Sequence, residues 1–533
     1  MRLLLGVGFA AILIAALSAA AKDTAAQDMV RTAAAPAVAL PGRVGQLSTI
    51  SGEVGFRGPG GTTWSDAEVN DPIASGVSLR TNPLARAVVR FGPDTVVLGD
   101  STEIAIINLN NRLAEIGVSR GRIGLDTSKL TQDEALQIDL SHGGVWLLQP
   151  GRYDINAGSG DQPPWVAAFT GSARFIGSGT GIAIEAGHRV LLGGSITTEA
   201  ADEDEFSVWC KARAIDATRL AAAYFVSPEM TGIAALDDAG SWKPDPNYGE
   251  LWLPDGLPAD WAPYRYGHWR WVAPWGWSWI DDRSWGFAPS HYGRWAFLDR
   301  RWSWVPGAYM AHPVYAPAVV AFLGTPGVGL SYAEGSGPAV AWFPLAPGEV
   351  YWPSDTNDLD YIRKLNAPDI PDLGIIRLRA NDEPPTEIVN GHFANRQFAS
   401  VVPRPVFVAG QAIGPSLIDI PRERLLDAPT VLGSPQIGPP APPTPARVVA
   451  AAGGHSSTAH FADHMLENAN WAKVVRAAAI RSRNYQRGAR MRAAHLLIPA
   501  YAAAPRSRHE IILRVAHASH IPASGEARKK VVR

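Results

Sequence analysis

The stretch Tyr266-Gly-His-Trp-Arg-Trp-Val-Ala-Pro-Trp-Gly-Trp-Ser-Trp279 sets the pattern of the middle of the chain, because it places tryptophans two positions apart. A second copy spans residues 285–304, again with Ala-Pro before a Tyr-Gly-x-Trp motif and a Trp-x-Trp pair behind it, and a weaker copy starts at Tyr248. Side chains two apart lie on one face of a strand, and residues 272–276 are short enough for a hairpin loop. Each copy therefore predicts one aromatic β-hairpin.

Tryptophan is concentrated in this region, since 14 of the 19 Trp lie in residues 241–353. Two interpretations stay open. The indoles form the core of a small β unit rich in Gly and Pro, or some of them form an exposed platform, because indole faces stack on sugars and attract cations. On the second interpretation the expected binding surface consists of Tyr266, Trp269, Trp271, Trp277, Trp279, Tyr292, Trp295, Trp302 and Trp304.

Residues 43–198, which precede this region, are rich in Val, Ile, Leu and Gly and contain many short alternating runs. Examples are residues 52–57, 87–91, 103–107 and 135–140, and turn residues such as Gly92-Pro-Asp94 separate the runs. Many short strands at this spacing are typical of an all-β sandwich or roll. Between the two β regions, residues 199–240 predict a bridging segment with a helix over 206–223, in which Cys210 acts as a small buried hydrophobe.

Composition excludes several classes of protein. Hydrophobic residues make up 46% of the 533 residues and charged residues 18%, which excludes a wholly disordered chain and a collagen-like one. Cys210 is the single cysteine, so an internal disulfide framework and a cysteine-built zinc site are excluded as well. We expect no cofactor and no metal site.

The two ends of the chain predict export and disorder. Residues 3–21 form an apolar run after Arg2 that ends in small residues, so residues 1–21 are typical of a cleaved signal peptide, although an uncleaved anchor stays open. We expect a disordered leader over 22–42, a mixed Pro-containing region over 354–424, and a disordered tail over 425–533 that is first Pro-rich and then basic. Residues 446–533 hold 15 Lys and Arg against four Asp and Glu, in a chain of net charge -2.

The basic tail has two interpretations. It is a disordered solubilising segment, or its Arg- and Ala-rich stretch 472–497 forms a basic amphipathic helix for an anionic surface. Export argues against nucleic acid as a partner. His460 and His464 also lie in the tail, four positions apart, and are expected to be solvated surface rather than a metal site.

Two regions resemble known families. Residues 43–198 resemble the FecR-type periplasmic β domain through segments such as Phe91-Gly-Pro-Asp-Thr-Val-Val-Leu98 and Leu148-Gln-Pro-Gly-Arg-Tyr-Asp154. Residues 224–353 resemble the uncharacterised Trp-rich domain that follows it in exported bacterial proteins, through Tyr224-Phe-Val-Ser-Pro-Glu-Met-Thr-Gly232 and Trp342-Phe-Pro-Leu-Ala-Pro-Gly348. FecR-type regulators bind a sigma-factor system through a cytoplasmic segment before the membrane span. Only Met1 and Arg2 precede the apolar run here, so the resemblance implies contact with another envelope component instead.

Motifs for catalysis are weak. Asp281 and Asp282 are adjacent on a predicted turn, and adjacent carboxylates rarely converge on one bond. Ser119 fits a Gly-x-Ser-x-Gly pattern, but β runs lie on both sides of it, whereas a nucleophile elbow needs a helix after it. We therefore expect no enzyme, and predict a periplasmic or outer-envelope interaction or scaffold protein that binds cell-wall glycan or a partner protein through the Trp-rich surface. A membrane-tethered FecR-like sensor is the alternative.

Overall fold

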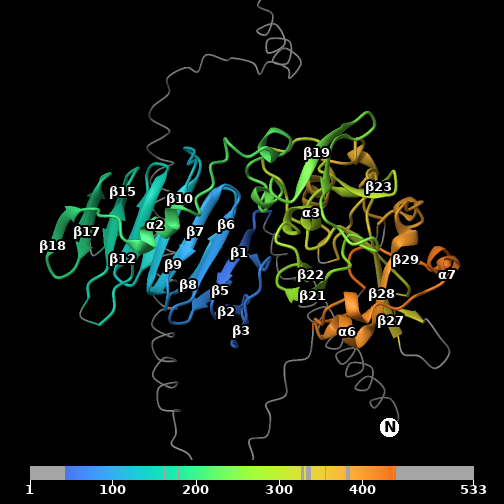
Figure 1. The fold of residues 1–533 in the computed structure, drawn as a ribbon, viewed down its shortest axis with the longest axis horizontal. Coiled ribbons are helices and arrows are strands. Elements are labelled where there is room, and N and C mark those ends of the chain that lie inside the picture. Colours follow the sequence, from blue (N-terminus) through green and yellow to red (C-terminus); the bar gives the residue numbers. More distant parts are fainter. Residues whose placement is uncertain are drawn as a thin grey trace, which may run out of the picture. The chain divides into compact units, whose positions relative to one another are not determined.

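The computed structural model describes residues 42–439, apart from residues 161, 178–179, 326–328, 332–337, 355, 380–383 and 436. The described residues belong to one compact unit, and they are mainly β, as the sequence predicts (Figure 1). The predicted signal, the leader up to residue 41 and the tail from residue 440, with His460 and His464, lie outside the described residues.

The first β region consists of two nine-stranded sheets (Figure 1). The first sheet has the order β18 (Ile196–Ala200), β17 (His188–Leu192), β14 (Trp165–Ala168), β13 (Gly151–Asn156), β10 (Arg122–Thr127), β7 (Asp94–Leu98), β6 (Arg86–Phe91), β1 (Gly45–Ser51) and β4 (Pro72–Ile73). The second has the order β16 (Thr180–Ile184), β15 (Ala173–Gly177), β12 (Gly143–Leu147), β11 (Ala135–Leu140), β9 (Leu113–Arg120), β8 (Glu103–Leu109), β5 (Ser78–Thr81), β2 (Val54–Arg57) and β3 (Ser65–Asp66).

The alternation of apolar residues builds the core between these sheets. Val89 and Val96 of the first sheet belong to the same apolar cluster as Ile116 and Ile138 of the second, so the region is a two-layer sandwich. Several consecutive strands pair as antiparallel neighbours, such as β6–β7 in one sheet and β8–β9 in the other, while β9 and β11 are parallel. Ser119 lies on β9, as expected for a strand residue.

The bridging helix is shorter than predicted. Helix α2 spans Glu205–Lys211, and Asp204 caps it: the carboxylate accepts from the Ser207 N–H at 2.9 Å, while Ser207 Oγ accepts from the Asp204 N–H at 2.7 Å. Beyond Lys211 the side chain of Asp216 accepts from the Thr218 N–H, which is a turn geometry that competes with a helix. Single 3-10 turns follow, η1 (Ala222–Tyr224) and η2 (Ile233–Ala235). Cys210 is half-buried against the sandwich.

The predicted aromatic hairpins are confirmed. β21 (Gly267–Val272) pairs with β22 (Gly276–Asp281), and β23 (Arg294–Leu298) pairs with β24 (Arg301–Val305) after the short helix α3 (Phe287–His291). The weaker copy is also in a hairpin, β19 (Gly240–Asp245) with β20 (Gly249–Pro254), but its motif begins the second strand. Gly267 and Gly293 of the Tyr-Gly-x-Trp motif have positive φ, and a Cβ there would lie 2.2 and 2.4 Å from backbone oxygens, which explains the repeated glycine.

Residues 320–431 complete the Trp-rich region with a five-stranded sheet. Its strands are β25 (Val320–Leu323), β26 (Leu330–Ser331), β27 (Pro338–Pro344), β28 (Ser400–Pro403) and β29 (Thr430–Val431). The helical elements around it are α4 (Leu359–Asn366), η3 (Leu373–Ile375), α5 (Thr386–Val389), η4 (Arg396–Phe398), α6 (Arg404–Val408), η5 (Gly414–Ser416) and α7 (Arg422–Asp427). The expected start of disorder at residue 425 is therefore too early, because β29 pairs with β25 and Ile437 is buried.

Buried polar contacts join the sandwich to the first aromatic hairpin. Asn70 Nδ2 donates to the carbonyl oxygens of Asp281 and Arg283, both at 2.8 Å. Arg270 Nη1 lies 2.6 Å from Oδ1 of the fully buried Asp71. Within the hairpin, alternation places Arg270 on the opposite face from Trp269 and Trp271. The polar face of the hairpin therefore contacts the sandwich and leaves the indole face for another part of the chain.

Candidate functional site

Most of the nine aromatic residues predicted to form a binding surface lie in the core. Trp269, Trp277, Trp279, Tyr292, Trp295, Trp302 and Trp304 are buried, Tyr266 is half-buried, and Trp271 is 38% exposed. The prediction of an exposed platform is therefore wrong for seven of them. The physical reason is that other segments cover the indole faces of both hairpins.

The first hairpin packs its indole face against the five-stranded sheet and α6. Trp269 meets Trp342 of β27 edge to face with ring centroids 5.4 Å apart, and it also contacts Phe322 of β25 and Phe407 of α6. Cross-strand pairing places Trp269 opposite Trp279. Such aromatic pairs contribute about 0.5–1.5 kcal/mol beyond the area they bury.

The indoles of the second hairpin form hydrogen bonds with segments that are close to it in the sequence. Trp295 lies opposite Trp304 in the register of β23 and β24. Their indole N–H groups donate to the carbonyl oxygens of Pro289 and Tyr292, each at 2.9 Å. Both donors are thus used inside the protein, and neither ring offers a polar group to a ligand.

The two adjacent aspartates do not form a pair. Asp281 is buried and accepts from Trp279 Nε1 and from the Arg283 N–H, both at 3.0 Å, whereas Asp282 is exposed. Burial raises the pKa of Asp281 to about 6, against the opposing effect of these two hydrogen bonds. Asp281 therefore holds the turn after β22.

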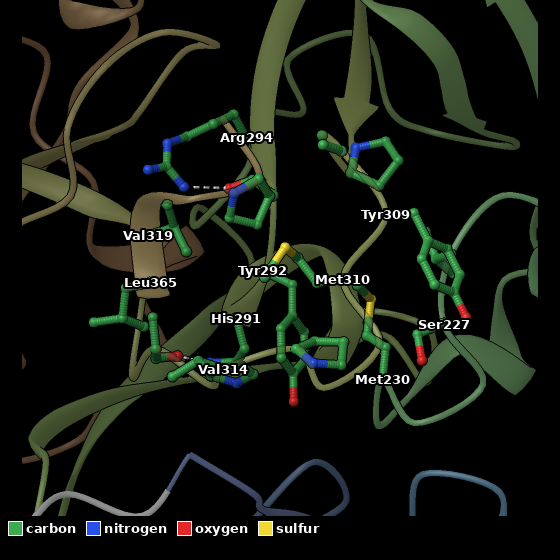
Figure 2. Close-up of a pocket in the computed structure, with 18 of the residues that line it drawn as sticks. Ser227, Met230, His291, Tyr292, Arg294, Tyr309, Met310, Val314, Val319 and Leu365 are labelled. Atoms are coloured by element: carbon green, nitrogen blue, oxygen red, sulfur yellow. Dashed lines mark hydrogen bonds between the residues drawn. The ribbon is translucent and has the colours of Figure 1, made fainter. Parts of the chain in front are cut away.

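A narrow cleft opens beside the second hairpin (Figure 2). One wall is the segment that contains Ser227 and Met230, another is the loop after β24 with Tyr309 and Met310, and α4 contributes Leu365. Of the nine predicted residues, Tyr292 lines the cleft. Tyr309 is 51% exposed at the rim, so the cleft is open to solvent on that side.

The polar side chains on the floor of the cleft already have partners in the protein. Ser227 Oγ donates to the carbonyl oxygen of Ala311 at 2.9 Å, and His291 Nδ1 donates to that of Ala316 at 2.8 Å (Figure 2). Complete burial lowers the pKa of His291 to about 3, so the imidazole is neutral at physiological pH. Burial also raises the pKa of the Tyr292 hydroxyl well above its usual range.

Arg294 is a buried cation that the surrounding backbone and side chains satisfy. Its Nε donates to the Glu349 carbonyl oxygen at 3.0 Å, Nη1 to that of Gly293 at 2.8 Å, and Nη2 to Asn366 Oδ1 at 2.9 Å. Nη1 also lies 3.3 Å from Oδ2 of the buried Asp369. Burial raises the pKa of Asp369 to about 6, although the attraction of Arg294 lowers it. The guanidinium therefore ties the cleft wall to the segment after α4.

This arrangement can take up an apolar group. The walls offer methionine, proline, valine and leucine side chains, and an exposed tyrosine lies at the rim. In the described part of the chain no three His, Cys, Asp or Glu side chains gather around a possible metal position. Sequence reasoning missed the cleft, because Met230, Met310 and Leu365 come from segments up to 135 positions apart with no shared motif.

Residues 233–349 match a family of unknown function, DUF6600. This match supports the resemblance of the Trp-rich region to an uncharacterised domain, and the FecR resemblance of residues 43–198 stays a prediction. A search of the curated proteins finds no match.

Two crystal structures of a candidate anti-sigma factor from Parabacteroides distasonis are similar to part of the chain at 12% identity and a TM-score of 0.23. The match covers 25% of this chain. It spans only 63–64% of the length of the anti-sigma factor chain. A TM-score this low does not establish a shared fold. Among the described residues no helix has the length and apolar character needed to cross a membrane.

Proposed function

We propose that this protein is a non-catalytic interaction module of the bacterial cell envelope that binds an apolar segment of a partner protein in the cleft beside the second hairpin. One observation carries the proposal: the cleft walls are mainly apolar, and the buried Ser227, His291 and Arg294 are already hydrogen-bonded within the protein, which leaves the exposed Lys364 and Tyr309 as the polar side chains of the lining that face solvent. The apolar run of residues 3–21 supports the envelope as the location.

The chemistry of the cleft favours a protein segment over a glycan. A glycan presents many hydroxyl groups, and a site that binds it needs unpaired donors and acceptors to replace water. Ser227, His291 and Arg294 are committed to internal partners. Met230 and Met310, in contrast, are polarisable side chains that adapt to different apolar shapes.

The same polar pairing supports a role without catalysis. A general base needs a pKa near the working pH and a free nitrogen or oxygen within reach of a substrate. The pKa of His291 is far below that range, and its Nδ1 proton is held by Ala316. Arg294 is fixed by four partners, so it is suited to holding the fold together.

The test is site-specific photo-crosslinking in the full-length protein, in cells that produce it. A benzophenone amino acid at Tyr309, on the rim, should give one discrete adduct with another envelope protein. Met310→Glu, which places a charge in the cleft wall, should remove that adduct. The matched control is the same crosslinker at Tyr248, an aromatic residue exposed on the turn of the β19–β20 hairpin.

Two results would overturn the proposal. One is an adduct at Tyr309 that persists unchanged in the Met310→Glu protein. The other is co-sedimentation of the purified protein with peptidoglycan that Met310→Glu abolishes, since this would make a glycan the ligand. Sequencing the mature N-terminus in the same preparation distinguishes a released protein, starting near Lys22, from a tethered one.

A further inference from the structure

Three polar side chains lie together on the face of the second sheet that is turned away from the core of the sandwich. Glu115 is on β9, and Gln137 and Asp139 are on β11. They alternate with Ile116 and Ile138, which belong to the core between the two sheets, so their side chains point to the opposite face. In the register of the parallel strands, Gln137 lies directly opposite Glu115. The three residues are called the β9–β11 cluster below.

The side chains of the β9–β11 cluster converge. Gln137 Nε2 donates to Asp139 Oδ1 at 2.5 Å, and the carboxyl groups of Glu115 and Asp139 are close enough for a hydrogen bond. All three residues are buried, with 2–4% of their surface exposed. Burial and the repulsion of Asp139 raise the pKa of Glu115 above its usual range. A shared proton or a bound cation between the two carboxyl groups would reduce this repulsion.

Two oxygen atoms of the cluster distinguish these possibilities. Glu115 Oε1 and Gln137 Oε1 are buried and have no hydrogen-bond partner among the described residues. Buried acceptors without a partner are rare in native proteins, and an ion or a water molecule usually accounts for them. A proton shared by the two carboxyl groups leaves the Gln137 oxygen unmet. A cation can bind that oxygen together with both carboxylates.

Glycines leave room beside Asp139. Gly117 of β9 and Gly144 of β12 flank it in the register of the sheet. A Cβ at Gly144 would lie 3.1 Å from Asp139 Oδ1, 3.3 Å from Gln137 Nε2 and 3.7 Å from Trp146 Nε1, so a side chain there would crowd these groups. Glycine inside a strand often marks a point where a ligand approaches closely.

We propose that the β9–β11 cluster is a calcium site that ties β9 to β11. Two carboxylates and an amide oxygen are the hard oxygen ligands that Ca²⁺ prefers, and water molecules complete its coordination. Mg²⁺ fits less well, because it requires shorter bonds in a regular octahedron, and side chains on neighbouring strands are held apart by the strand spacing. Because two carboxylates contribute, we expect a Kd of about 0.1–1 mM, as in extracellular calcium modules.

The proposal departs from the expectation of no metal site, which rested on cysteine and histidine. It is compatible with the lack of any group of three His, Cys, Asp or Glu side chains in the described part of the chain, because its third ligand is the amide of Gln137. The cluster lies in the sandwich, and none of its residues lines the cleft beside the second hairpin. The calcium experiments and the Met310→Glu experiment can therefore fail independently.

The experiment uses the full-length protein, freed of metal with EDTA, and terbium as a luminescent substitute for calcium. Terbium emits when a nearby indole absorbs light for it, and Trp146 borders the cluster. We expect terbium emission on excitation of the indoles, displaced by Ca²⁺ and, at concentrations at least tenfold higher, by Mg²⁺. Trp146→Phe should remove most of the emission and leave calcium binding in titration calorimetry unchanged. Emission that Trp146→Phe does not reduce would place the ion elsewhere and overturn the proposal.

Glu115→Gln tests the cluster itself, because it keeps the size of the side chain and removes one charge. We expect calcium binding at least tenfold weaker than in the wild type. The melting temperature in EDTA should be equal to or higher than that of the wild type, since the repulsion with Asp139 is relieved. Calcium should raise the melting temperature of the wild type by several degrees and leave that of Glu115→Gln unchanged.

The matched control is Glu103→Gln. Glu103 lies on β8 of the same sheet, 4.0 Å from Arg57, and is not part of the cluster, so this variant should keep the wild-type calcium affinity. Equal calcium affinity of the Glu115→Gln and wild-type proteins, or a wild type that responds to neither ion, would overturn the proposal. If Glu115→Gln does not fold, the wild-type and Trp146→Phe terbium titrations decide the question.

Discussion

At the scale of single residues, burial sets the charge states in this protein. His291 is completely buried, and its pKa falls from 6.5 to about 3 because the charged form loses its solvation. The buried carboxyl groups of Asp71, Asp281 and Asp369 shift the other way, each to a pKa of about 6, for the same reason. Burial thus keeps both kinds of group closer to their neutral forms.

His291 should make the protein less stable in mild acid. Its folded pKa lies below its unfolded pKa, so the stability linked to it is complete above pH 6.5 and is lost as the pH falls toward 3. The loss is about 1.4 kcal/mol for each pH unit below 6.5. The difference between the wild-type and His291→Gln proteins in urea unfolding from pH 7 to pH 4.5 measures it.

The comparison with His291→Gln isolates this contribution from the buried carboxyl groups, which act in the opposite direction. The variant should be less stable at pH 7, because its side chain packs less well against Tyr315 and Phe287. Its free energy of unfolding should then fall less steeply with acid. Equal slopes for the two proteins would show that His291 does not titrate as its burial requires.

At the scale of elements, the first hairpin is stabilised by the packing of its indole face against other segments of the chain. Among the described strands, β21 and β22 pair only with each other, and a lone two-stranded hairpin is at best marginally stable in water. The Trp269–Trp342 and Trp277–Phe407 contacts attach it to β27 and α6. Tertiary packing, rather than the hairpin's own hydrogen bonds, therefore holds this element.

Truncating an indole of this hairpin should cost stability in proportion to its burial. Trp279 is fully buried, so Trp279→Ala should lower the free energy of unfolding by about 3–5 kcal/mol. Trp271 is 38% exposed, and Trp271→Ala should cost under about 1 kcal/mol. Chemical denaturation followed by far-ultraviolet circular dichroism checks both values. Similar costs for the two changes would mean that Trp279 does not belong to the core.

At the scale of the whole molecule, the sandwich and the Trp-rich region are joined by buried polar groups. Asp71 is fully buried and pairs with Arg270, 199 positions away in sequence. Asn70 adds two hydrogen bonds to the turn after β22. A buried carboxylate without its partner is strongly destabilising, so this contact couples the two regions.

Arg270→Ala should therefore uncouple the regions. We expect the wild type to unfold in a single thermal transition in calorimetry, and the Arg270→Ala protein to unfold in two transitions at lower temperature, with a loss of about 3 kcal/mol. The control is Arg189→Ala, which removes an exposed pair with Glu199 and should cost under about 1 kcal/mol. A single, unshifted transition in the Arg270→Ala protein would contradict the coupling.

Local spacing was sufficient to predict several elements of this protein. The alternating runs of residues 43–198 predict strands, and the Trp-x-Trp pairs on the two sides of a short loop predict aromatic hairpins, which the structure forms with Trp269 opposite Trp279. Both depend on the two-residue repeat of a strand and on short turns, which neighbouring residues determine. The helix over 206–223 was overestimated, because Asp216 offers the backbone a competing hydrogen bond that periodicity does not register.

The sequence by itself determined that the chain is mainly β and that each hairpin gathers its indoles on one face. Only the tertiary structure decided that this face is core, because the covering residues Phe322, Trp342, Phe407 and Ile437 lie some 40 to 170 positions away. Alternation along a strand says which side chains share a face, but it is the same whether water or protein covers them. Burial depends on contacts between distant segments, and those contacts also build the cleft.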